Sequence, residues 1–268
     1  MPASILTAER VGDEGGLPPE IMLLVFAIAA AVIISLVVCI LVSGYWYHLR
    51  KLAFRKMAKD LDLHYTDNPD HPLLEEITDF SLFSKDNKNP FRNIRVKKAF
   101  IYGETNNVAI GIFDYAYIVE KYEWRVNKRN ARAQSYLQSI MALQSKLIRV
   151  PRFHLWPSQE YLENVSRDYI KKPETDDLTE IPIDDHETFS SLFTLKSDDQ
   201  TSIRKFFDID LMTLLTQMRG IAMEGRDGVV IFYYPDRLIQ PHETKAYFAK
   251  ALEIYQHMIE SEQGINRG

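Results

Sequence analysis

The chain has little cysteine and lacks the common catalytic signatures. Its single cysteine, Cys39, has no partner within the chain, which excludes an intrachain disulfide framework and a cysteine-rich zinc site. The sequence contains no G-x-x-x-x-G-K-[ST] loop, no G-x-G-x-x-G turn, no H-E-x-x-H helix and no G-x-S-x-G elbow. The most direct nucleotide, zinc-protease and esterase interpretations are therefore removed, and we expect no cofactor and no metal.

Histidine and carboxylate residues are present but are not arranged as a metal site. The seven histidines are scattered without a recurrent i, i+4 pair. His154 lies among aromatic and aliphatic residues, a context that favours a buried strand histidine over a ligand or a base. Residues 173–187 hold seven carboxylates and no base, but they lack the alternating spacing and central glycine of a calcium loop. We predict an exposed acidic loop there.

Charge is absent from one long stretch. Residues 21–44 run for 24 positions without a charged side chain. At 1.5 Å per residue a helix of this length spans the roughly 30 Å hydrocarbon core of a bilayer. The stretch therefore predicts one transmembrane helix.

The flanks of this stretch predict an orientation. Tyr45-Trp46-Tyr47 follow it as an interfacial aromatic belt, and five basic residues come next, whereas only Arg10 is basic before it. The asymmetry predicts a single-pass protein with its N-terminus outside and the remainder cytoplasmic. A cleaved signal peptide is the alternative, because Val42-Ser43-Gly44 loosely matches a cleavage site, but the leader is acidic and the apolar run is long.

Four segments follow from these features. We expect a flexible extracytoplasmic tail over residues 1–20, a transmembrane helix over 21–47, a basic juxtamembrane helix over 48–65 and a soluble domain over 66–268. The prolines and Asn68 within residues 66–72 end the juxtamembrane helix.

The soluble part alternates strands and helices in a way that predicts an α+β fold built from antiparallel hairpins with packed helices. Strands are expected over residues 94–104, 108–119, 136–147, 181–183, 221–226 and 229–234, the last two joined by an Asp227-Gly228 turn. Helices are expected over residues 158–162 after a Ser158 cap, over 199–218 and over 242–262.

The order of these features resembles a group of uncharacterised bacterial membrane proteins with one N-terminal span and a cytoplasmic α+β domain. The residues that carry the resemblance are FSLF at 80–83, IFDYAY at 112–117 and PRFHLWP at 151–157. The resemblance implies a location in the bacterial inner membrane, and no activity follows from it. Asp208-Ile209 stands where such sequences often place a proline, which predicts a break between two helical halves. A second F-x-x-L-F segment at 189–193 leaves an internal duplication open.

Asp114 is the most unusual residue of the predicted sheet. Strand alternation places it on one face with Val108, Ile110 and Ile112, while Phe113, Tyr115 and Tyr117 share the other face. Because a buried carboxylate needs donors or a counter-charge, we expect a backbone turn or a basic side chain to satisfy it. A role in ligand binding is the alternative.

A basic, aromatic stretch at residues 121–132 is the other candidate site. It contains Arg125, Lys128, Arg129 and Arg132 beside Tyr122 and Trp124. Residues 48–132 carry 16 Lys and Arg against 12 Asp and Glu, whereas residues 133–268 carry 15 against 21, so the basic half adjoins the predicted span. This distribution fits contact with anionic lipid headgroups, although an ordinary solubilising hairpin tip fits as well. Nucleic acid is a poorer match because of the anchor.

These features favour a membrane-anchored binding or scaffold module, with a protein partner and a place in a membrane-associated assembly. The alternative is a membrane-tethered enzyme acting on a small ligand or a lipid headgroup, with Asp114 in its site. A purely structural accessory subunit is the third interpretation. A concave pocket lined by Asp114 and another polar group would favour the enzyme.

Overall fold

The structure, a computed structural model, describes the backbone of residues 19–67, 71–83, 95–96, 100–125, 128–165 and 177–264. It divides into two compact units, residues 1–49 and residues 50–268.

The first unit is dominated by an apolar helix. Helix α1 (Pro19–Asp60) contains the whole uncharged stretch, and its large apolar side chains from Ile21 to Val42 are exposed. By length and composition this helix is suited to crossing a membrane, a test that a signal sequence also passes. The final residues of α1, from Arg50 onward, belong to the second unit.

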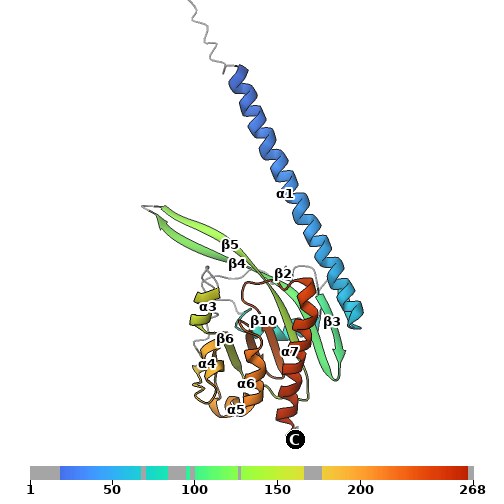
Figure 1. Ribbon diagram of the computed structural model, residues 1–268, viewed down its shortest axis with the longest axis vertical. Coiled ribbons are helices and arrows are strands. Elements are labelled where there is room, and N and C mark those ends of the chain that lie inside the picture. Colours follow the sequence, from blue (N-terminus) through green and yellow to red (C-terminus); the bar gives the residue numbers. More distant parts are fainter. Residues whose placement is uncertain are drawn as a thin grey trace, which may run out of the picture. The chain divides into compact units, whose positions relative to one another are not determined.

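The second unit is built on one antiparallel sheet of ten strands (Figure 1). The spatial order is β1-β3-β4-β5-β10-β9-β6-β8-β7, with β2 paired to β4. The strands are β1 (His64–Thr66), β2 (Arg95–Val96), β3 (Phe100–Thr105), β4 (Val108–Arg125), β5 (Lys128–Gln144), β6 (Phe153–Pro157), β7 (Thr179–Glu180), β8 (Phe193–Ser197), β9 (Ala222–Arg226) and β10 (Val229–Tyr233). The predicted α+β class is confirmed.

Eight helical segments accompany the sheet in the part of the chain that the structure describes. Besides α1 they are α2 (Pro72–Glu76), the 3-10 turn η1 (Ile77–Asp79), α3 (Gln159–Val165), α4 (Glu187–Leu192), α5 (Gln200–Phe206), α6 (Ile209–Thr216) and α7 (Pro241–Glu262). The predicted break at Asp208-Ile209 is confirmed, because Asp208 caps α6 and separates it from α5. The predicted cap at Ser158 is also present, and its hydroxyl accepts a hydrogen bond from the Tyr161 amide at 3.2 Å.

Each face of the sheet has its own apolar core. On one face Val108, Ile110 and Ile112 belong to a cluster that includes residues of α5, α6, α7 and the end of α1. On the other face Phe113 and Tyr115 belong to a smaller cluster with residues of α2, η1 and the following turn. The predicted alternation along β4 is confirmed for residues 108–115, which fixes the face on which Asp114 lies.

The hairpins differ from the expected ones mainly in length. The β9–β10 hairpin turns at Asp227 and Gly228, which have φ values of 50° and 82°, so the predicted tight turn is confirmed. The predicted ends of β4 and β5 were wrong, because β4 continues to Arg125 and β5 begins at Lys128. The predicted strand at 181–183 was also displaced, since β7 is Thr179–Glu180.

Candidate functional site

Asp114 lies in the middle of β4 and is 5% exposed. Its register partner across the ladder is Ser139 of β5. Because both residues occupy the aliphatic face, their polar groups must find partners among the elements that cover that face.

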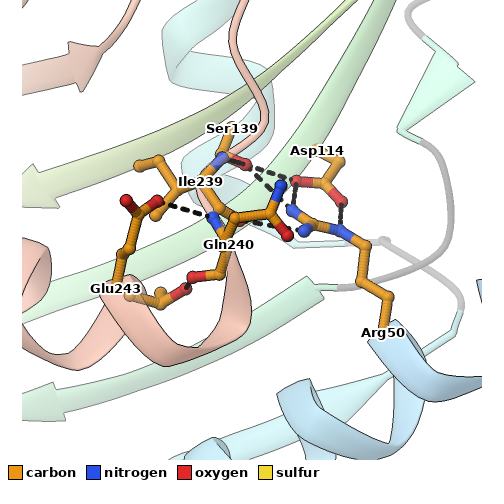
Figure 2. A network of polar contacts seen from close by, with 7 residues as sticks. Arg50, Asp114, Ser139, Ile239, Gln240 and Glu243 are labelled. Atoms are coloured by element: carbon orange, nitrogen blue, oxygen red, sulfur yellow. Dashed lines mark hydrogen bonds and ion pairs between the residues drawn. The ribbon is translucent and has the colours of Figure 1, made fainter. Parts of the chain in front are cut away.

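The counter-charge of Asp114 is Arg50. Arg50 Nε donates to Asp114 Oδ2 at 2.7 Å, and Arg50 Nη2 donates to Asp114 Oδ1 at 2.7 Å (Figure 2). This two-point geometry matches the planar guanidinium to the planar carboxylate. The guanidinium also lies 4.8 Å from the centre of the Phe54 ring, and the two side chains of the ion pair are 15% and 7% exposed. The expectation that a basic side chain satisfies Asp114 is thus met by a residue 64 positions earlier.

Ser139 completes the network. Its hydroxyl donates to Asp114 Oδ1 at 2.7 Å and accepts from Arg50 Nη2 and from the Ile239 amide, each at 3.0 Å. One donated and two accepted hydrogen bonds use the full capacity of a hydroxyl group. Asp114, Arg50 and Ser139 therefore form a closed unit.

The segment that leads into α7 is bound to the same unit. Arg50 Nη1 donates to the Ile239 carbonyl at 2.8 Å, so one guanidinium joins α1, β4 and residue 239 (Figure 2). Next to it, Gln240 and Glu243 form a capping box at the start of α7, in which the Gln240 amide donates to Glu243 Oε2 at 3.1 Å. Helix α1, strands β4 and β5 and the start of α7, which lie far apart in sequence, therefore meet at Arg50.

The network has the properties of a structural anchor. Both carboxylate oxygens of Asp114 accept hydrogen bonds from a permanent cation, which leaves the carboxylate poorly suited to act as a general base. Three cavities with volumes of about 840, 230 and 20 Å³ are lined by described residues, and none of the three includes Asp114. The Asp114 carboxylate is therefore held by Arg50 and Ser139 and is not a lining group of these three cavities.

The basic, aromatic stretch lies on the outer part of the β4–β5 hairpin. The backbone register pairs Lys121 with Arg132, Trp124 with Arg129, and Arg125 with Lys128. The side chains of residues 117–136 lie outside the described part of the structure, and so do those of Arg95 and Val96. Lipid binding by Arg125, Lys128, Arg129 and Arg132 therefore stays a prediction.

A second buried carboxylate, Glu224 of β9, was not recognised from the sequence. It is 3% exposed and accepts hydrogen bonds from the Ser81 amide and hydroxyl at 2.7 and 2.5 Å, from the Leu82 amide at 3.1 Å and from the Tyr233 hydroxyl at 2.9 Å. Burial raises the pKa of Glu224, and the hydrogen bonds from Ser81 and Tyr233 oppose that rise. Glu224 thus fastens the FSLF segment to the sheet.

His154 lies close to Glu224. The two side chains approach to 4.0 Å, and the His154 ring stacks on Trp156 with centroids 5.5 Å apart. His154 is 1% exposed within β6, which confirms a buried strand histidine. Asp210 lies in the first turn of α6, where a carboxylate interacts favourably with the helix dipole. Among the described residues no group of three or more His, Cys, Asp or Glu residues is placed to hold a metal ion.

No model of a known protein family matches the chain, and no curated protein matches it. Among solved structures the chain is similar to the crystal structure of the mycobacterial trehalose monomycolate transport factor A, TtfA. The TM-score is 0.49 and the sequence identity is 12%, over 79% of this chain and 93% of that chain. A likeness at this level does not identify a function.

Proposed function

We propose that this protein is a membrane-anchored binding or scaffold module. The apolar part of α1 holds it in the inner membrane, the folded domain lies on the cytoplasmic side, and the domain contacts a protein partner and anionic lipid headgroups as a subunit of a membrane-associated assembly. No catalytic step is included, because the Arg50–Asp114 unit is closed.

The outer part of the β4–β5 hairpin carries this proposal. β3 pairs with β4 only as far as Ile112, β2 pairs with Tyr115 and Ala116, and β10 pairs with β5 from Ile140 onward. From Tyr117 to Arg125, and from Lys128 to Tyr136, the two strands pair only with each other within the described residues. We call this part the ribbon; it extends past the rest of the sheet in Figure 1.

We propose that a ribbon of this kind adds little to the folding of the domain, because within the described residues its two strands pair only with each other. A two-stranded hairpin is marginally stable by itself in water, and its edges offer unpaired backbone groups. A long two-stranded ribbon is therefore better explained by contact with a partner than by stability.

The anchor network supports a module whose parts keep a fixed arrangement. Arg50 is the first residue of the folded unit and is joined to β4, β5 and the start of α7 by four hydrogen bonds. In several known systems a buried ion pair adds little stability and instead favours one unique arrangement of the groups that it joins. A scaffold requires such an arrangement.

Photo-crosslinking in intact cells tests the proposal. A photoreactive residue at Ser135 of the ribbon should give a stable crosslinked species of defined mass. The same residue at exposed Glu180 on β7, an edge strand of the sheet, is the matched control and should give none. No species from either position, or the same species from both, would contradict the proposal.

A further inference from the structure

The register of the ribbon separates its basic residues between two faces. Residues of a strand alternate between faces, and directly paired residues share a face. Lys121 pairs with Arg132 and Arg125 pairs with Lys128, and because positions 121 and 125 are an even number apart, all four lie on one face. Arg129 pairs with Trp124 and lies on the opposite face. We call the first face the cationic face.

The separation concentrates charge. Between pairs 121–132 and 125–128 the cationic face also contains the Glu123–Asn130 pair, so its net charge is +3. The opposite face carries the pairs from Ile118–Ser135 to Trp124–Arg129. Its charged residues are Glu120 and Arg129, so its net charge is zero. The sequence, in which basic residues are spread evenly along the stretch, does not show this asymmetry without the register.

Pairing like charges across the strands has a cost. Lys121 faces Arg132 and Arg125 faces Lys128, and directly opposite like charges destabilise a hairpin. A surface that only needed solubility would interleave the two signs. The two like-charged pairs therefore indicate that an external anion balances them.

We propose that the cationic face docks on the anionic surface of the bilayer that holds the chain's own anchor, an inference that rests on the proposed membrane anchoring. Positions 121 and 125 are four residues apart, roughly 13 Å along a strand. Four basic positions spread over this distance match a planar array of headgroups better than one phosphate group. The apolar helix keeps the ribbon at high effective concentration near such an array.

The test uses the full chain in liposomes. In a Cys39→Ala background, single cysteines replace Asn130 on the cationic face or Ala131 on the opposite face, and each carries a fluorophore. Liposomes contain either neutral lipid alone or neutral and anionic lipid, with a headgroup-attached spin label as quencher. Quenching should be several-fold stronger at position 130 than at position 131 in anionic liposomes, and it should fall toward the neutral-lipid level at high salt.

A charge-matched variant separates the pattern of charges from their sum. One variant carries all four substitutions K121Y, Y122K, W124R and R125W, which exchange neighbouring residues. It keeps the composition and net charge of the chain but moves two basic residues to the opposite face. Each basic residue near an anionic surface contributes roughly a fivefold preference for it. The preference for quenching at position 130 over position 131 should therefore be lost in this variant.

Several results would overturn the inference. Two of them concern the quenching itself: equal quenching at the two positions, or quenching that the exchange leaves unchanged. A third is suppression of the quenching by millimolar inorganic phosphate at constant ionic strength. A fourth is binding of a single-stranded oligonucleotide by the same face without any lipid dependence. If the crosslink at Ser135, on the opposite face, forms while quenching shows no face preference, the scaffold function stands and the lipid docking alone is wrong.

Discussion

The residue at the centre of the domain, Asp114, is tolerated on an aliphatic face because its charge is matched in both position and shape. A guanidinium supplies two parallel donors in a plane, and a third nitrogen reaches the Ile239 carbonyl. Lysine at position 50 offers a point charge and cannot make this pattern. Arginine is therefore required at position 50 by geometry as well as by charge.

Replacing Asp114 with Asn should destabilise the domain. The variant keeps the shape of the side chain but leaves the Arg50 cation buried without a counter-charge. Breaking a buried pair in this way costs about 3 kcal/mol or more. Chemical unfolding of the full chain in detergent measures the loss.

Asp67 is the matched control for Asp114. It accepts hydrogen bonds from Lys51 and Arg55, also residues of α1, but its side chain is 44% exposed. Asp67→Asn should change stability little, because exposed ion pairs contribute little. Equal losses of stability from Asp114→Asn and Asp67→Asn would refute the anchor. So would a double variant R50Q/D114N whose loss of stability equals the sum of the losses from R50Q and D114N alone.

Glu224 should make stability depend on pH. Its pKa in the folded protein is raised above the ordinary value of 4.5. Below pH 4.5 both folded and unfolded chains are protonated at this residue and its full contribution is present. As pH rises toward the folded-state pKa, only the unfolded chain loses the proton, so stability falls.

The pH dependence is measured as the difference between the wild type and Glu224→Gln. The advantage of the wild type in melting temperature should be largest near pH 4.5 and should shrink as the pH rises. His154 at 4.0 Å and Tyr233 are present in both proteins. Parallel melting curves across this range would show that Glu224 does not titrate as described.

The sequence predicts some of these residue roles and misses others for a physical reason. The face of Asp114 follows from strand alternation alone. Its partner does not, because Arg50 meets Asp114 only when the end of α1 packs on the sheet. Glu224 is missed because a single acid beside the Asp227-Gly228 turn has the pattern of an exposed hairpin residue, and its donors come from a turn 143 positions away.

At the scale of elements, the helix pair α5 and α6 shows how one residue sets a boundary. Asp208 Oδ1 accepts from the Leu211 amide at 2.7 Å, and the Asp208 carboxylate also contacts His257 and Ser261 of α7 at 3.0 to 3.3 Å. Asp208 therefore both begins α6 and joins it to the last helix.

Substitution of Asp208 by Ala should cost about 1 to 2 kcal/mol, the value of a lost N-cap. Asp210→Ala is the control in the same turn, since it removes only the interaction with the helix dipole and should cost about 0.5 kcal/mol. Thermal unfolding compares the two. A larger loss from Asp210 than from Asp208 would contradict the boundary role.

Elements with clear turn or periodicity signals were predictable, and the outer part of the β4–β5 hairpin was not. The β9–β10 hairpin and α7 carry their own turn and periodicity. Beyond Val119, β4 and β5 continue by pairing with each other as far as Arg125 and Lys128, but the polar residues there have no clear strand pattern.

At the scale of the whole molecule, the account predicts an orientation across the membrane. In a Cys39→Ala background a cysteine at Ser4 should react with a membrane-impermeant maleimide in spheroplasts, whereas one at exposed Lys245 on α7 should react only after lysis. Labelling of Lys245→Cys in intact spheroplasts would reverse the proposed orientation, and loss of the N-terminal label with a shorter chain would indicate cleavage.

We propose that the protein acts through the ribbon and that removal of the ribbon leaves the fold of the domain intact. Tyr117 and Tyr136 are a directly paired position, so residues 118–135 can be replaced by Asn-Gly, the sequence of a two-residue hairpin turn.

The most direct measurement compares this shortened chain with the wild type by native gel electrophoresis of detergent-extracted membranes and by thermal unfolding. We predict an unchanged melting temperature together with loss of the higher-mass assembly. Retention of the assembly by the shortened chain would contradict the account.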